Sequence, residues 1–155
     1  MRRAIIPLAL GTALVGVPVS TAFAENTGVR ACEIVSRADW RAAFGPGKPI
    51  FSFNDPSNCD YIIADTHSMF GIDVSYLTPG ALARNRAHMP GTIRMLPGLG
   101  AGAFVSYGRG RNGSGYYFML EAPRRGWIVT VSGGSPHHYP VPRIVRLAGR
   151  ALSHL

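Results

Sequence analysis

Three short strand-like segments, separated by two short loops, constrain the fold of this chain more than any other feature. The segments cover residues 103–107, 116–121 and 127–131. Each contains aromatic or β-branched residues, which favour strands. The first loop contains Asn112-Gly113, a pair typical of β-hairpins. Because loops this short join antiparallel neighbours, the three segments predict an antiparallel meander.

Three earlier segments also favour strands and enlarge the predicted sheet. They cover residues 49–53, 59–64 and 71–76. A turn pattern, Asp-Pro-Ser-Asn at residues 55–58, separates the first two. The third segment alternates apolar and polar residues from Gly71 to Tyr76. This alternation is typical of a strand with one buried and one solvated face, so we expect a sheet that is covered on one face.

A helix is predicted to begin at Ser36, before the first strand. Ser36 and Asp39 have the spacing of a capping box, in which each side chain accepts a hydrogen bond from the other residue's backbone. Trp40 falls on the same helical face as Ala43 and Phe44. A tryptophan here either packs in the core or forms a platform for a ligand, and we expect core packing.

Two further helices are predicted later in the chain. Thr78 and Pro79 are typical of a helix start, and the helix would continue to about Met89. The last segment, from Pro142 onward, has an amphipathic pattern typical of a helix that packs on a sheet. Its apolar face contains Ile144, Ala148, Ala151, Leu152 and Leu155, and its polar face contains Arg143, Arg146 and Arg150.

The first 24 residues have the pattern of a secretory signal peptide. Two arginines precede an uncharged apolar segment, and small residues precede Ala24. We expect cleavage between Ala24 and Glu25, which leaves residues 25–155 as a single secreted globular domain. A retained membrane anchor is the alternative, but the apolar segment of about 16 residues is short for a span of roughly 20. We expect no membrane-spanning segment after cleavage.

The chain contains two cysteines, Cys32 and Cys59. An exported chain meets oxidising conditions, so we expect the two to form a disulfide. A metal site or a reactive thiol is the alternative, but no further cysteine or histidine stands at ligand spacing. Lipidation of Cys32 is not expected, because Arg30 stands where a small or apolar residue is needed. The predicted fold is therefore α+β: an antiparallel sheet of about five to six strands, flanked by N-terminal and C-terminal helices, with one disulfide.

The composition indicates a basic protein. The formal net charge is +8, and removal of two arginines with the signal peptide leaves 14 − 8 = +6. A positive field favours anionic partners, so we expect the partner to be an anionic component of the cell envelope or a secreted protein. Nucleic-acid binding is not expected, because it needs a denser basic face and a recognisable module.

A candidate ligand-binding group lies on the two loops of the predicted meander. It contains Arg109, Arg111, Arg124 and Arg125, with Tyr107 and Tyr116 beside the first pair. Each arginine pair would make a local basic surface next to aromatic rings, which could hold an anionic ligand. The alternative is that these arginines are ordinary solvated loop charges.

Two other patterns bear on catalysis and cofactors. Gly98, Gly100 and Gly102 precede a strand-like segment, whereas a dinucleotide-binding loop follows a strand and opens a helix. We therefore expect a tight turn and no cofactor. Ser135, His137 and His138 suggest a hydrolase, and His67 and Asp65 suggest further catalytic or metal-binding groups. These residues show neither the histidine spacing of a zincin nor a Gly-x-Ser-x-Gly elbow, and a histidine pair in a loop usually faces solvent. We therefore expect no catalytic residue and no metal.

Several segments are shared with a known family. They are Ala31-Cys32-Glu33-Ile34-Val35 before the Trp40 helix, Cys59-Asp60-Tyr61, Leu96-Pro97-Gly98-Leu99-Gly100 before Ala103-Phe104, and the closing helix. In these segments the chain resembles the small exported proteins of high-G+C Gram-positive bacteria grouped as domain of unknown function 3558. The family's usual lipid-anchored cysteine is missing here. The resemblance covers most of the mature chain and implies an antiparallel sheet flanked by helices, similar to the PsbP protein of photosystem II and the Mog1 proteins of nuclear transport. It implies no activity.

Three hypotheses for function follow. The first is a secreted, non-enzymatic binding or interaction module of the bacterial cell envelope or the surrounding medium. The second is a secreted hydrolase that uses Ser135, His137 or His138. The third is an inhibitor of a secreted enzyme.

Overall fold

The structure is a computed structural model that describes residues 28–51, 56–63, 66, 68–110, 113, 115–138 and 140–155, with the backbone alone described for residues 49–51. The predicted cleavage site between Ala24 and Glu25 lies outside the described residues. Arg111, Asp65 and His67 do as well. None of the helices in the described ranges is long and apolar enough to cross a membrane.

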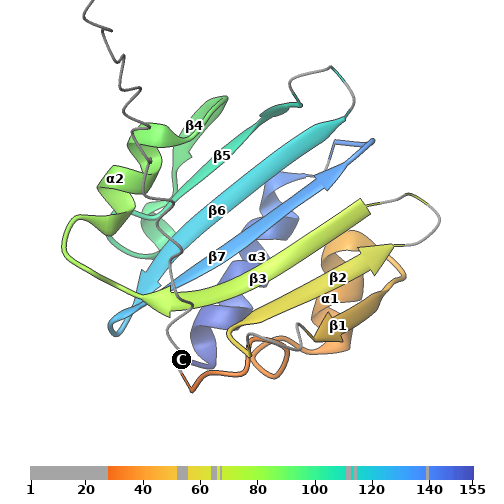
Figure 1. Ribbon diagram of the computed structural model, residues 1–155, viewed down its shortest axis with the longest axis horizontal. Coiled ribbons are helices and arrows are strands. Elements are labelled where there is room, and N and C mark those ends of the chain that lie inside the picture. Colours follow the sequence, from red (N-terminus) through yellow and green to blue (C-terminus); the bar gives the residue numbers. More distant parts are fainter. Residues whose placement is uncertain are drawn as a thin grey trace, which may run out of the picture.

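The described residues form three α-helices and seven strands. The helices are α1 (Arg37–Phe44), α2 (Ala81–His88) and α3 (Val141–Ser153), and a 3-10 turn, η2, covers Pro97–Leu99. The strands are β1 (Lys48–Phe51), β2 (Asn58–Ile63), β3 (Ser68–Tyr76), β4 (Thr92–Met95), β5 (Phe104–Arg109), β6 (Tyr116–Arg124) and β7 (Trp127–Ser135). The strands form one antiparallel sheet in the order β1-β2-β3-β7-β6-β5-β4 (Figure 1). The predicted α+β fold is confirmed.

The sheet consists of two antiparallel meanders joined side by side. Strands β1, β2 and β3 form the first, and β4, β5, β6 and β7 form the second. The two meet where β3 pairs with β7, so these two strands lie at the centre of the sheet. The prediction missed β4, which raises the strand count to seven. Its sequence, Thr-Ile-Arg-Met, alternates polar and apolar residues, but the segment is only four residues long and all four are exposed on the edge of the sheet.

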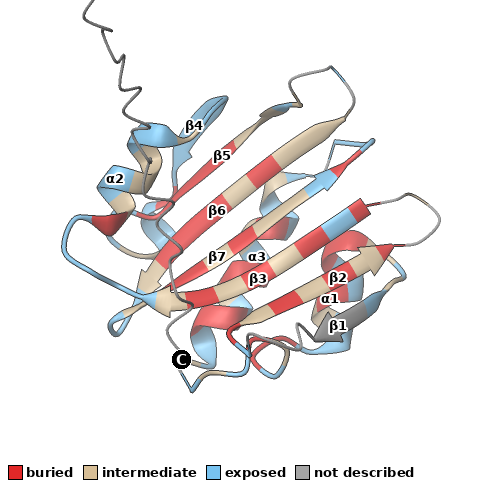
Figure 2. Ribbon diagram, viewed as in Figure 1, coloured by how far each residue is buried: buried red, intermediate tan, exposed pale blue. Residues whose placement is uncertain are grey.

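One face of the sheet carries the core. Buried and less buried residues alternate along β3, as the sequence predicted, and Figure 2 shows the same alternation along the neighbouring strands. Helices α1 and α3 lie behind the sheet in Figure 1 and cover the buried face. Trp40 is fully buried and stacks on Tyr61 with ring centroids 4.9 Å apart. Core packing of Trp40 is therefore confirmed.

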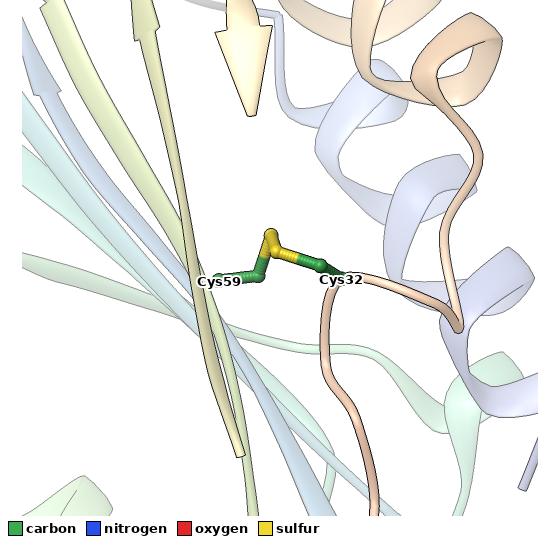
Figure 3. Close-up of a disulfide and its surroundings, with 2 residues drawn as sticks. All are labelled: Cys32 and Cys59. Carbon is green, nitrogen blue, oxygen red and sulfur yellow. A yellow bond between two sulfur atoms is a disulfide. The ribbon is translucent and has the colours of Figure 1, made fainter. Parts of the chain in front are cut away.

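The predicted disulfide joins the N-terminal segment to the sheet (Figure 3). Cys32 lies before α1, Cys59 lies in β2, and their Cα atoms are 5.0 Å apart. Cys59 is fully buried on the helix-covered face. The bond therefore fixes the segment that leads into α1 against the inner face of β2.

The helix ends agree with the sequence for α1 and differ for α2. The capping box of α1 is present: Ser36 Oγ accepts from the Asp39 backbone N–H at 3.1 Å, and Asp39 accepts from the Ser36 N–H at 3.2 Å. By contrast, α2 begins at Ala81, so the predicted capping by Thr78 is wrong. Gly80 has a φ of 72° and turns the chain before the helix, which a Pro-Gly pair favours over an immediate start.

The last helix and the glycine turn follow the predictions. In α3, Ile144, Leu147, Ala148, Ala151 and Leu152 are buried against the sheet. The glycine segment forms η2 and then leads directly into β5, so it is a tight turn between β4 and β5 as expected.

Candidate functional site

The second face of the sheet is only partly covered. Glu121 in β6 points to this face, where Asn85 of α2 donates to both of its carboxylate oxygens at 3.0 and 2.9 Å. Helix α2 therefore lies over the β6 side of the face. The rest of the face, toward β2 and β3, is hollowed into a cleft of about 960 Å³. We call this cavity the open-face cleft.

Two aspartates form the floor of the open-face cleft. In the strand register, Asp60 pairs with Gly71, while Asp73 pairs with Asn58, so the two aspartates are diagonal neighbours on one face. Diagonal neighbours of this kind lie roughly 7–8 Å apart, close enough for one ligand to contact both. Among the described residues that line the cleft, none is arginine, lysine or histidine. The described part of this lining therefore carries negative charge, although the chain as a whole is basic.

Asn58 adds an unsatisfied hydrogen-bond acceptor to the same floor. Its Oδ1 is buried and has no hydrogen-bond partner in the described part of the chain. Buried polar atoms in folded proteins are nearly always paired, so an orphaned one requires an explanation. Asn58 lines the open-face cleft, but its Oδ1 is enclosed by the folded chain, so a ligand contacts this oxygen only after the side chain turns toward the cleft.

The walls of the cleft are apolar and adaptable. Met69 of β3 is 57% exposed, although a methionine has little reason to face water. Met119 and Tyr117 of β6 and Met89 after α2 line the same cavity. Methionine side chains are flexible and polarisable, and they adjust to ligands of different shapes. The walls therefore suit an apolar body of variable outline.

Two glycines keep the cleft open. A Cβ atom at Gly134 would meet nothing closer than the Tyr116 carbonyl oxygen at 3.9 Å, so a side chain there would project into open space. At Gly71, a Cβ atom would lie 3.2 Å from Asp60 Oδ1 and 3.8 Å from Ser132 Oγ. The missing side chains leave the carboxylate and hydroxyl groups of the floor accessible from the cleft.

Glu121 is the acidic group of this face with the most unusual environment. It is only 4% exposed beneath α2. Burial raises the pKa of Glu121 above its usual value, the bonds from Asn85 lower it, and the nearby charge of Asp73 raises it further. The negative charge of Asp73, on the floor of the open-face cleft, therefore disfavours ionisation of the buried Glu121.

Part of the predicted arginine and tyrosine group comes together on the opposite, helix-covered face. Arg109 donates from Nη2 to the Tyr116 hydroxyl at 3.3 Å, and its guanidinium lies 5.4 Å from the centre of that ring. Tyr107 lies beside them in β5. These side chains and His137 line a smaller cavity of about 260 Å³ near the start of α3. A ligand-binding role for this cavity stays a prediction.

The other predicted arginines do not join this group. Arg124 ends β6 and Arg125 lies in the turn before β7, so both lie at the opposite end of β6 from Tyr116. Arg125 has a φ of 48°, which a two-residue hairpin turn requires. Arg109 and the pair of Arg124 and Arg125 therefore form two separate charged surfaces, at opposite ends of β6.

The predicted hydrolase residues form a structural turn. Ser135 is 8% exposed, and its Oγ accepts hydrogen bonds from Ser68 Oγ at 3.0 Å and from the backbone N–H of His137 at 3.1 Å. The ring of His138 packs edge-on against Tyr116, with centroids 5.4 Å apart. A serine nucleophile needs an imidazole within hydrogen-bond reach of its hydroxyl. Ser135 is instead bonded to the backbone of His137 and to another serine.

The described residues contain no group of at least three His, Cys, Asp or Glu side chains that could hold a metal ion. Comparison with known proteins gives no match to a family model, a curated protein or a solved structure. The resemblance to domain of unknown function 3558 therefore stays a prediction, and any functional inference rests on the geometry of the site.

The sequence contained a signal for the open-face cleft that our predictions did not use. The alternation in residues 71–76 places Asp73 on the solvated face. Asp60 occupies an equivalent alternate position in β2. The register between the two strands, which brings these residues together, could not be read from either segment alone.

Proposed function

We propose that this protein is a non-enzymatic, extracytoplasmic binding module and that its ligand lies in the open-face cleft. The observation that carries the proposal is a cavity of about 960 Å³ with carboxylates on its floor and methionines on its walls. Ligand pockets typically measure roughly 300–1,000 Å³ and combine apolar walls with a few polar groups. The disulfide is compatible with an oxidising compartment.

The ligand that fits this chemistry carries a positive charge on an apolar body. Asp60 and Asp73, which line the cleft, would attract the cation. The positive net charge of the whole chain opposes this only weakly, because salt screens charges beyond about 8–10 Å at physiological ionic strength. The nearby carboxylates therefore decide the preference of the site.

The hydrolase hypothesis has less support than the binding hypothesis. The hydroxyl of Ser135 is held by Ser68 and by a backbone N–H, and these bonds fix the end of β7. The geometry provides a reason for this serine to be present without catalysis.

The proposal is tested with a pair of probes that differ in charge. Decyltrimethylammonium and decyl sulfate carry the same apolar chain with opposite head groups, and both are titrated into the purified protein by calorimetry below their micelle concentrations. We expect the cation to bind in the cleft and the anion, which the exposed arginines attract, to bind only outside it. Asp60→Asn together with Asp73→Asn should weaken cation binding by about tenfold, since each partly exposed charge pair contributes up to about 1 kcal/mol and about 1.4 kcal/mol is tenfold.

Replacing one of two glycines with leucine tests whether the cationic probe binds in the cleft. Gly134→Leu should weaken binding of the cation, because a Cβ atom there meets nothing closer than 3.9 Å and the added side chain would project into the cleft. Gly98→Leu is the matched control, since a Cβ atom at Gly98 has nothing within 4 Å and Gly98 does not line the cleft. Cation binding that is unchanged by Gly134→Leu would show that the cleft is not the site.

A further inference from the structure

Helix α3 carries a row of arginines on the side that faces away from the core. An α-helix turns about 100° per residue, so Arg143, Arg146 and Arg150 fall within an arc of about 60° and extend about 10 Å along the axis. All three are exposed. We call them the arginine row. Helix α3 lies behind the sheet in Figure 1, whereas the open-face cleft is floored by residues on the other face of the sheet.

The arginine row borders a small cleft between α1 and α3. The cleft has a volume of about 180 Å³, and its remaining lining consists of Asp39, Ala42, Ala43 and Leu147. The small side chains of α1 leave the guanidinium groups accessible. A cavity of this size holds a single compact group, such as one phosphate, rather than a whole organic ligand.

The charges of this cleft are unbalanced. Asp39 Oδ1 lies 4.0 Å from Arg150 Nε, while Oδ2 of the same carboxylate accepts from the backbone and hydroxyl of Ser36. Within the described ranges, Arg143 and Arg146 form no ion pair. Three guanidinium groups therefore face one carboxylate, which is already engaged in capping α1, and the cleft retains a positive charge.

We propose that the arginine row binds the phosphate groups of a linear, phosphate-containing polymer. Guanidinium groups bind phosphate through paired, parallel hydrogen bonds and remain charged at any physiological pH. Arginines spaced along about 10 Å of helix offer successive contacts to one extended chain.

A flat bilayer fits this surface less well than a polymer. Proteins that bind membrane interfaces usually bury large apolar side chains among the lipids. Among the described residues, the exposed large apolar side chains are Met69, Tyr76, Leu77, Ile93 and Met95, and none belongs to α1 or α3. The proposal is independent of the open-face cleft, because the two surfaces share no residue.

The test uses long-chain inorganic polyphosphate as the probe and calorimetry at several salt concentrations as the readout. The variant that replaces Arg143, Arg146 and Arg150 with glutamine should bind at least about tenfold more weakly than the unmodified protein. The slope of log Kd against log salt concentration should be smaller by about 2 in this variant. Three phosphate contacts are lost, and each contact with a single-stranded polyanion contributes about 0.7 to the slope.

A control variant separates the row from net charge. Replacement of Arg30, Lys48 and Arg94 with glutamine removes an equal number of positive charges from exposed positions elsewhere. It should change the affinity for polyphosphate by less than about threefold. If the triple variant of the row does not fold, Arg146→Gln alone is used, because no described ion pair involves that residue. Decyltrimethylammonium binding should be unchanged in every variant of the row.

Four results would overturn the proposal. The first is that polyphosphate does not bind the unmodified protein, and the second is that the control variant loses as much affinity as the variant of the row. The third is full competition by orthophosphate at the same phosphate concentration. The fourth is that the row is needed for binding to phosphatidylglycerol vesicles but not for binding to polyphosphate. The third result would indicate a site for single phosphate ions, and the last would indicate a membrane surface.

Discussion

Two adjacent glycines of β7 point to opposite faces of the sheet, and a methyl group should have opposite effects at the two positions. A Cβ atom at Gly133 would overlap the ring of Phe70 and would lie 2.9 Å from the Met69 carbonyl oxygen. At Gly134 the closest atom is a carbonyl oxygen at 3.9 Å. Gly133→Ala should therefore destabilise the fold, and Gly134→Ala should not.

The packing of Phe70 sets the size of the effect. Its ring is fully buried, stacks on Phe44 with centroids 3.9 Å apart and lies 6.0 Å from Phe118, so it has little room to move. Overpacking of a core typically costs about 1–3 kcal/mol, and this site belongs at the upper end. Replacing glycine also restricts the unfolded chain, which stabilises either variant by about 0.4–1 kcal/mol. The net expectation is a loss of about 2 kcal/mol for Gly133→Ala and a gain of about 0.5 kcal/mol for Gly134→Ala.

Urea unfolding followed by tryptophan fluorescence measures both variants against the unmodified protein. A loss of about 2 kcal/mol corresponds to a melting temperature lower by roughly 8 °C for a domain of this size. The comparison is controlled internally, because the two variants differ by one position and have the same effect on the unfolded chain. If both variants had the same free energy of unfolding, the packing of Gly133 against Phe70 would be wrong.

Two further predictions concern covalent and electrostatic features of the fold. Replacing both Cys32 and Cys59 with alanine should lower the free energy of unfolding by about 3.6 kcal/mol, since the loop they close contains roughly 28 residues; an unchanged urea midpoint would show that the disulfide does not constrain the unfolded chain. Because burial raises the pKa of Glu121 above 4.5, the folded chain keeps a proton that the unfolded chain has already released, and stability falls as pH rises from about 4.5 through the folded pKa. In Glu121→Gln this loss of stability should be absent. Urea titrations between pH 4 and pH 7 measure it, and the same dependence of stability on pH in both proteins would contradict the raised pKa of Glu121.

Local signals allowed much of the fold to be predicted from the sequence. The capping box of Ser36 and Asp39 acts over three residues, and the alternation in β3 reports burial of one face directly. The disulfide followed from the count of cysteines and the expected compartment. These features depend on neighbouring residues or on a single pairing, so a sequence read without a structure is sufficient for them.

Features that depend on long-range pairing were missed. Edge strand β4 is short and fully exposed, and it forms because β5 provides hydrogen-bonding partners. The open-face cleft needs the register between β2 and β3 together with the position of α2. The predicted arginine group, by contrast, was selected by residue type on loops, and the structure separates Arg109 from Arg124 by the length of β6.

The distribution of charge over the two faces argues that each face has a partner of its own. An antiparallel sheet can leave one face to water, and such a face is normally lined with polar and charged side chains. Here the chain contains 16 basic residues, yet none of the described ones lines the open-face cleft, where glycines, methionines and two aspartates are found. Five arginines lie instead on α1 and α3, and three of these form the arginine row. A protein held by its helix layer on an anionic polymer would present the open-face cleft to the surroundings, so the two proposed sites can be occupied at the same time.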